Sequence, residues 1–228
     1  MVIKLFSGLL ILTLANCNNH NEHAVIAIPD SSKISQKNIT ATRKENSCKT
    51  EIICDSVYKN KGYKLTLSVF DTTNDDETIP NTLFTLSKLT NGQYLPIYSD
   101  SVFNKIPQIK FADFNADNVK DILVQNISDV RSNWTYHLYL IDTVRNKLKK
   151  IKGFEEIKNP AYIKDYDLVD NYVMSGENYT SFYKIQGDSV KDFNIVIYDN
   201  QNDVAGNKYR YAFENAFRQI TRKEKNNR

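Results

Sequence analysis

The chain has few of the residues from which catalytic sites and phosphate-binding loops are usually built. Its 228 residues include three His, three Cys and seven Gly. No G-x-S-x-G turn is present to hold a nucleophilic Ser, and the scattered glycines form no loop able to surround a phosphate. These absences argue against a Ser hydrolase and against a nucleotide-binding protein.

Histidine is too scarce to support much acid-base catalysis. His20 and His23 lie in a polar segment, and His137 lies in the alternating run WTYHLYLID. Any Ser-His-Asp triad would have to use His137, for which a packed or surface position is the ordinary role. We therefore expect that the protein is not an enzyme.

Charge of one sign is also lacking. Thirty Lys and Arg against 27 Asp and Glu give a net charge of +3, and no basic stripe runs through the segments expected to fold. A balance of this kind gives no reason to expect nucleic acid as a partner. The basic cluster at the end, residues 221–228, is expected to be a disordered tail.

The first residues, MVIKLFSGLLILTLANC, combine a basic Lys4 with a short apolar run. This pattern predicts a signal peptide over residues 1–16, too short to span a bilayer stably. Its end resembles the bacterial lipobox, which implies lipidation of Cys17 and contact with a membrane through that anchor only. An ordinary signal peptide is the alternative. The polar residues 17–46 then form a flexible tether with a reach on the order of 30 Å.

If Cys17 is acylated, Cys48 and Cys54 remain as an even pair in an exported protein. Oxidising compartments favour disulfides, so we expect these two residues to be bonded. Neither His nor further Cys lies nearby, which makes a metal site at this pair a poor interpretation.

From about residue 47 to 220 the hydrophobic period is close to two, which predicts a single β-rich domain. Three stretches repeat one hairpin pattern: FTLSKLTNGQYLPIYS, YHLYLIDTVRNKLKKI and SFYKIQGDSVKDFNIVIYD. Regular hairpins favour an all-β fold, either a small β-propeller-like domain or a sandwich. The segment KYRYAFENAFRQI has helical spacing and predicts one C-terminal helix packed on a sheet.

One acidic loop, in FADFNADNVKDILV, has the residue types of a calcium site. Asp113, Asn115, Asp117 and Asp121 occupy positions 1, 3, 5 and 9, and the carbonyl of Val119 is the expected backbone ligand. Ca²⁺ accepts six to eight oxygen ligands in a flexible shell, which suits such a set. The loop resembles the calcium loops of FG-GAP or VCBS-like propeller blades. A solvated acidic turn is the alternative.

The loop departs from an EF-hand in two places. Asn118 stands where an EF-hand has Gly, and Val124 stands where it has a bidentate Glu. Asn tolerates a left-handed backbone, so the first departure costs little. The second, together with the β-type run DILVQ, shifts the comparison away from helix-loop-helix sensors.

The segment SGENY, residues 175–179, lies between two predicted strands. With the lipobox-like start, the acidic loop and the run YHLYLIDTVRNKLKKIKGFEEIKNP, it resembles a family of exported bacterial lysozyme-inhibitor-like lipoproteins with calcium-binding, propeller-like folds. The resemblance covers about residues 106–186. The alternative for SGENY is a tight turn with Gly176 at positive φ and Tyr179 beginning a strand.

The resemblance implies an inhibitor in the bacterial cell envelope, facing the outer membrane or periplasm. Its partner would be a lysozyme-like peptidoglycan hydrolase, with Ser175, Gly176 and Tyr179 entering that enzyme's cleft. Ca²⁺ in the neighbouring acidic loop would stiffen this inhibitory loop. Two other functions stay open: a calcium-stabilised surface module that binds glycan or protein, and a hydrolase with an unrecognised pair of carboxylates.

Overall fold

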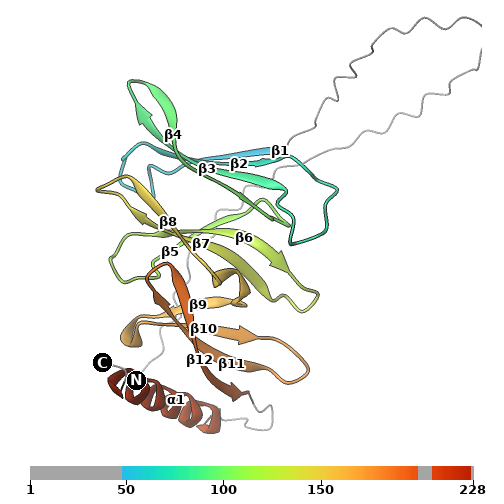
Figure 1. The fold of residues 1–228 in the computed structure, drawn as a ribbon, viewed down its shortest axis with the longest axis vertical. Coiled ribbons are helices and arrows are strands. Elements are labelled where there is room, and N and C mark those ends of the chain that lie inside the picture. The colour runs from blue at the N-terminus through green and yellow to red at the C-terminus, as the bar shows by residue number, and fades with distance from the viewer. Residues whose placement is uncertain (1–47, 200–206, 227–228) are drawn as a thin grey trace, which may run out of the picture.

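A computed structural model describes residues 48–199 and 207–226, which form twelve β-strands, two short 3-10 helices and one α-helix (Figure 1). The predicted signal peptide, Cys17 and the whole of the predicted tether lie outside the described residues. The all-β class with a single C-terminal helix is confirmed.

The strands form three four-stranded antiparallel sheets, in each of which strands consecutive in the chain are neighbours. Sheet 1 contains β1 (Cys48–Ile53), β2 (Tyr63–Val69), β3 (Thr82–Thr90) and β4 (Gln93–Val102). Sheet 2 contains β5 (Ile109–Ala112), β6 (Asp121–Ser128), β7 (Trp134–Asp142) and β8 (Lys147–Ile151). Sheet 3 contains β9 (Pro160–Ile163), β10 (Leu168–Val173), β11 (Tyr179–Gln186) and β12 (Ser189–Tyr198). The short helices are η1 (Phe154–Glu156) and η2 (Lys164–Tyr166), and α1 is Asn207–Asn226.

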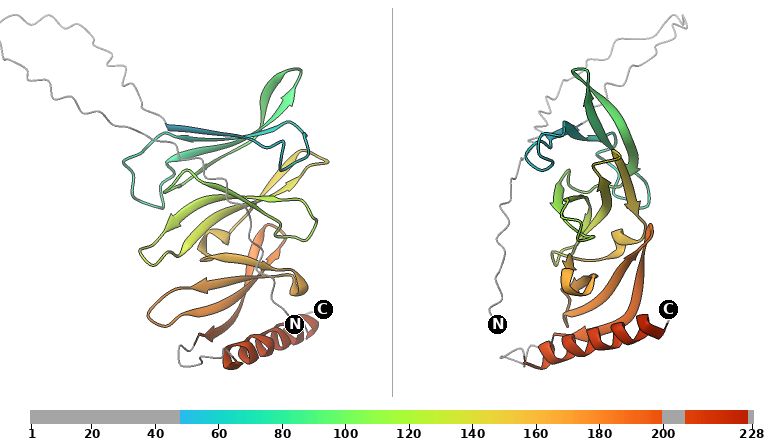
Figure 2. Two further views of the ribbon diagram at one scale, coloured as in Figure 1. Left: turned by 180° about the vertical axis from the view of Figure 1, so that it is seen from behind. Right: turned by 90° about the vertical axis from the view of Figure 1, so that its left-hand side faces the viewer.

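The three sheets are stacked, and α1 lies across the outer side of sheet 3 (Figures 1 and 2). One apolar cluster lies between sheets 1 and 2, a second between sheets 2 and 3, and a third between sheet 3 and α1. None of these clusters in the described residues joins sheet 1 to sheet 3. The result is a layered, sandwich-like stack.

Sheet 2 is buried on both faces, and its sequence shows why. Along β6, Ile122 and Val124 belong to the cluster shared with sheet 1, whereas Leu123 belongs to the cluster shared with sheet 3. Successive side chains on a strand point to opposite faces, so a continuous apolar run serves both neighbours. The same division holds on β7, where Tyr139 faces sheet 1 and Leu138 faces sheet 3.

The three predicted hairpins are confirmed as β3–β4, β7–β8 and β11–β12. Each is formed by the last two strands of its sheet, which explains why one pattern recurs three times. The β3–β4 turn has positive φ at both Asn91 and Gly92, as a two-residue hairpin turn requires.

The expected disulfide between Cys48 and Cys54 is wrong. The segment CKTEII forms β1, paired with β2 from Cys48 opposite Val69 to Ile53 opposite Lys64. An extended strand of this length holds its ends about 20 Å apart, whereas the Cα atoms of a disulfide lie within about 7 Å. Cys54 is a buried thiol, and burial raises its pKa to about 11.

Helix α1 continues beyond its expected end at residue 220, so residues 221–226 are helical and not a disordered tail. Lys223 and Lys225 lie in its last turn, where positive charge interacts favourably with the helix dipole. Lys223 Nζ also donates a hydrogen bond of 3.0 Å to the carbonyl of Phe193. Within the described parts of the chain, no helix combines the length and apolar character needed to cross a membrane.

Removing the Phe182 ring should open the contact between sheet 3 and α1. Phe182 is fully buried, with ring centroids 5.2 Å from Phe213 and 5.4 Å from Phe217. Phe182→Ala should lower the free energy of unfolding by about 3–5 kcal/mol. Phe70→Ala, at a ring that is 47% exposed, should change it by less than about 1 kcal/mol. Urea unfolding measures both variants, and equal losses would contradict this account of the core.

Candidate functional site

The 175–179 loop joins β10 to β11, with Gly176 and Glu177 exposed and the other three residues half-buried. Tyr179 begins β11, as the tight-turn interpretation predicted. Gly176 does not adopt positive φ, so that part of the prediction is wrong. A Cβ at Gly176 would meet nothing within 4 Å, which means that the fold itself does not require glycine here.

The loop carries its own hydrogen bonds. Ser175 N donates to Asn178 Oδ1 at 3.0 Å, and Ser175 Oγ donates to the carbonyl of Glu177. At its far side, Asp199 N donates to the carbonyl of Asn178 at 2.8 Å. The loop is therefore tied both to itself and to the end of β12.

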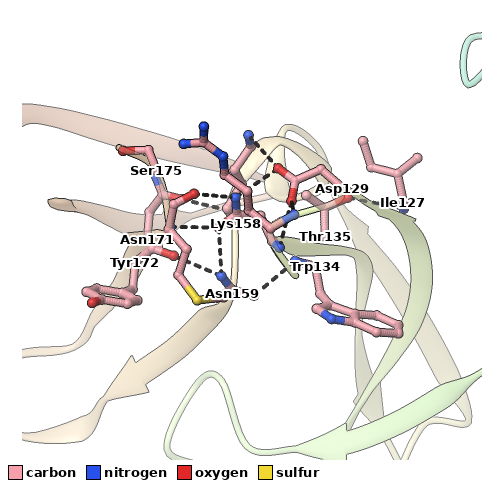
Figure 3. Close-up of polar contacts among 12 residues, drawn as sticks. Ile127, Asp129, Trp134, Thr135, Lys158, Asn159, Asn171, Tyr172 and Ser175 are labelled. Carbon is pink, nitrogen blue, oxygen red and sulfur yellow. Dashed lines mark hydrogen bonds and ion pairs between the residues drawn. The ribbon is translucent and has the colours of Figure 1, made fainter. Parts of the chain in front are cut away.

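The near side of the loop is held by Asn133, which follows the β6–β7 turn. Its amide donates to the carbonyl of Met174 and accepts from Met174 N, both at 2.8 Å. Asn159 Nδ2 donates to Asn133 Oδ1 at 3.1 Å and to the carbonyl of Tyr172 at 3.0 Å (Figure 3). Asn133 is buried, so its amide acts as a two-point clamp between sheet 2 and the base of the loop.

Asp129 orients the clamp. Its carboxylate accepts from Asn133 N at 3.0 Å and from Asn133 Nδ2 at 2.8 Å, and it forms an ion pair with Lys158 at 3.6 Å (Figure 3). The hydrogen bonds from Asn133 hold the pKa of Asp129 down at about 2. The carboxylate therefore stays ionised, and the clamp intact, at any pH near neutrality.

Two tyrosines, Tyr172 and Tyr198, lie beside the loop, close to Tyr179 at its end. The ring centroids of Tyr179 and Tyr198 are 6.0 Å apart, and Tyr198 is 56% exposed. Tyr172 Oη donates to Asp199 Oδ2 and accepts from Asn178 Nδ2, each at 3.2 Å. The loop consequently rises next to a partly exposed aromatic surface, and Tyr179 belongs to none of the core clusters.

The acidic loop, residues 113–121, connects β5 to β6 at the other end of sheet 2. Asp113 accepts hydrogen bonds from Asn115 N at 3.2 Å and from Asn118 N at 3.0 Å. Asp117 accepts from Val119 N at 2.7 Å and from Asn115 Nδ2 at 3.0 Å. Asn118 has φ 64°, the left-handed conformation expected for position 6.

Asp121 is the buried member of this loop. It is fully excluded from solvent and accepts from Phe114 N at 2.9 Å and from Ile141 N at 3.3 Å. Burial raises its pKa to about 7, and the negative charges of Asp117 and Asp113 add to the effect. No Lys or Arg of the described residues forms an ion pair with it.

The donor types and their order along the loop fit Ca²⁺, and a buried carboxylate without a cationic partner is a second point in favour. However, nowhere in residues 48–199 and 207–226 do three or more His, Cys, Asp or Glu side chains form a group able to hold a metal ion. The loop carboxylates are instead turned to backbone N–H groups. Ion binding would therefore require the carboxylates of half-buried Asp113 and exposed Asp117 to turn toward a common point.

The acidic loop is not a neighbour of the 175–179 loop, and that expectation is wrong. The acidic loop enters β6 at Asp121, whereas the Asn133 clamp follows the other end of β6. Eight strand residues separate these ends by roughly 25 Å. The two features therefore lie toward opposite ends of the strands.

His137 is packed, as expected. Its ring is 7% exposed, and Nε2 lies 3.3 Å from the carbonyl of Phe103. Nδ1 is buried without a hydrogen-bond partner, and burial lowers the pKa of the ring. A role in proton transfer at an open site does not follow from this position.

No family model matches the chain, and the search of curated proteins found no match. Among solved structures, the chain is similar to one described as "Structure of a Xanthomonas Type IV Secretion System related protein". The two share 13% identity over 72% of this chain and 86% of that chain, with a TM-score of 0.40. Similarity at this level carries no argument about fold or function.

Acid should destabilise the fold through His137. The pKa of His137 is lower in the folded than in the unfolded protein. Below about pH 6.5 the unfolded chain therefore binds a proton at this residue more readily than the folded chain does, and the free energy of unfolding falls as the pH falls. His137→Gln keeps an acceptor and donor but does not titrate. The free energy of unfolding of the wild type, minus that of this variant, should decrease from pH 7.5 to pH 5. Asp121 and Asp170 have raised pKa values, so they change the free energy of unfolding with pH in the opposite direction. Both proteins contain these two residues, so their effects cancel when one free energy is subtracted from the other. A flat difference would contradict the assignment.

Proposed function

We propose that the protein is an exported, lipid-anchored, calcium-binding inhibitor of a lysozyme-like peptidoglycan hydrolase, and that the 175–179 loop enters the active site of that enzyme. One observation carries the proposal. The loop presents exposed Gly176 and Glu177 from a base fixed on one side by Asn133 and on the other by Asp199, and nothing inside the protein requires glycine at its tip.

The chemistry of a lysozyme cleft suits such a loop. The cleft holds two carboxyl groups, one protonated and one ionised, on either side of the scissile bond. The backbone N–H groups near Gly176 can donate to an ionised carboxylate, and the Tyr179 phenol can bond with either form. The Ser175 hydroxyl can donate to a carboxylate if it gives up its bond to the carbonyl of Glu177. Glu177 carries the loop's own negative charge, so it must lie outside the carboxylate pair, against a basic or solvated rim of the target.

The clamp matters for affinity because a loop that is already ordered loses less conformational entropy on binding. Asn133, Asn159 and Asp129 together supply that order from sheets 2 and 3. Gly176 matters for a different reason, since the absence of a side chain lets the backbone approach the cleft floor closely.

Calcium belongs to the proposal as a structural ligand. Asp113, Asn115, Asp117 and Asp121 would hold it with their side chains, and Val119 with its carbonyl. When bound, Ca²⁺ would compensate the buried charge of Asp121 and fix the β5–β6 connection. Because this loop lies a strand's length from residues 175–179, the ion would stabilise sheet 2 and would not touch the inhibitory loop.

The cell-envelope location rests on residues outside the described part of the chain. Lipidation at Cys17 and the tether of residues 17–46 would let the domain stand away from the bilayer and meet a hydrolase in the same compartment.

A calcium-stabilised surface module for glycan or protein is the second candidate. The partly exposed Tyr179 and Tyr198, next to Tyr172, favour it because sugars and protein partners both pack on aromatic faces. Such a module would bind soluble glycan without slowing a hydrolase.

Gly176→Leu should abolish inhibition while leaving the fold intact. The added side chain meets nothing within the protein but would block close approach to a cleft. In a cell-wall lysis assay with lysozymes of several classes, the concentration for half-inhibition should rise at least about 100-fold, with an unchanged Tm. Tyr179→Ala should weaken inhibition too, by about 10-fold or more.

Val144→Leu, at an 87% exposed position in the β7–β8 turn, is the matched control and should inhibit normally. The proposal fails if the wild type inhibits no lysozyme class, or if Gly176→Leu inhibits as well as the wild type. Glycan binding without inhibition would support the second candidate instead.

Calcium should raise Tm, and Asp113→Asn with Asp117→Asn should remove the effect. At a free Ca²⁺ concentration about 100 times Kd, binding to the folded state alone adds about 2.7 kcal/mol to the free energy of unfolding. Asp76→Asn changes another exposed turn aspartate, which accepts from Thr78 N and Oγ1, and should leave the calcium response intact. Titration by calorimetry gives an independent reading. No heat of binding and no Tm shift would exclude a calcium site.

A further inference from the structure

Helix α1 carries most of the unbalanced charge of the protein. Its twenty residues include six Lys or Arg and two Glu, a net charge of +4, whereas the whole chain has +3. The rest of the chain is therefore close to neutral. The excess of positive charge is therefore located on α1 and is not spread over the protein.

The apolar face of α1 is already used. Phe213, Phe217 and Ile220 pack on sheet 3, together with Tyr209 and Ala216. The helix therefore has no free apolar face to insert into a bilayer or to pair with another helix. What it offers to a partner is its outer face.

That outer face bears an aromatic and basic stripe, which consists of Tyr211, Arg218, Arg222 and Lys225. Spacings of seven, four and three residues place all four side chains on one side of a helix with 3.6 residues per turn. All four are exposed, Tyr211 to 64%. The stripe spans about 21 Å along the axis and lies opposite the residues that contact sheet 3.

The charge of the stripe is only weakly offset. Glu224 is engaged on the other side of the helix, where it forms an ion pair of 3.0 Å with Lys184. Glu214 is the acidic residue that lines the same groove as Arg218, Arg222 and Lys225, a depression of about 470 Å³. Tyr166 forms the wall of this groove, with its ring stacked on Phe217 at 3.9 Å between centroids.

We propose that the outer face of α1 docks on a membrane surface that contains anionic phospholipids. Guanidinium and ammonium groups bind phosphate, and tyrosine is favoured at the level of lipid headgroups. Arg218, Arg222 and Lys225 are spread over about 10 Å of helix axis. The groove that they line is shallow and open to solvent, on a helix that lies on the outer side of sheet 3 (Figure 2). This arrangement suits an extended anionic surface. This contact would be additional to the proposed lipid anchor.

The expected strength is modest. Each basic residue near an anionic surface contributes about a fivefold increase in binding, so the three together give about 100-fold. A contact of this strength holds a domain against a membrane only together with a second signal, such as an acyl chain. It does not depend on the 175–179 loop.

The test uses the chain from position 17 to Arg228 with Cys17→Ser, so that no acyl group contributes. Binding is measured by sedimentation with vesicles of phosphatidylcholine containing 30% phosphatidylglycerol, at low ionic strength. The variant Arg218→Gln, Arg222→Gln, Lys225→Gln should bind about 100-fold more weakly, with unchanged Tm and unchanged lysozyme inhibition. Vesicles of phosphatidylcholine alone should not bind the unsubstituted chain.

The matched control removes the same charge elsewhere, through substitution by Gln of the exposed residues Lys59, Lys147 and Lys149. It should lose no more than a few-fold in binding. Equal losses in both triple variants would overturn the proposal, because net charge alone would then explain binding. Failure of the unsubstituted chain to bind anionic vesicles would also overturn it, even if the chain bound soluble polyphosphate, which would assign the stripe to a soluble polyanion.

Discussion

The structure depends on the burial of both faces of sheet 2. Sheets 1 and 3 each cover one face of it, and neither contacts the other through a core cluster of the described residues. Removal of apolar surface from water is the dominant favourable term in folding. In a central sheet, each strand buries apolar side chains on both of its faces. Alternate residues of β6 and β7, such as Ile122 and Leu123, therefore hold three layers together.

This layering decides where the candidate sites lie. Strand β6 has the acidic loop at one end and the β6–β7 turn at the other. The proposed calcium loop and the base of the proposed inhibitory loop are therefore separated by the length of this strand. The end that bears Asn133 is rigidly joined to sheet 3 through Met174. The proposed inhibitory loop thus gains its order from polar contacts between sheets, independently of whether the distant acidic loop binds an ion.

Burial of apolar surface also explains how α1 lies on the outer side of sheet 3. Apolar residues of α1 complete the last core cluster, and this leaves its charged residues facing outward as a group. The opposite end of the stack has no described helix over it. The two ends of the protein are consequently different in charge and in shape, and α1 gives the molecule an orientation with respect to any charged surface.

The sequence by itself determined the class of the fold, its hairpins and the position of its helix. The hydrophobic period of two and turn residues such as Asn91 and Gly92 act over a few neighbours, so their effect can be predicted from the order of residues alone. Only the tertiary structure decided which strand ends meet. The Asn133 clamp joins residues 41 positions apart, and no local pattern marks that asparagine as different from others. The error at Cys48 and Cys54 has the same cause, because pairing of β1 with β2 extends a segment that cysteine spacing alone suggested was a closed loop.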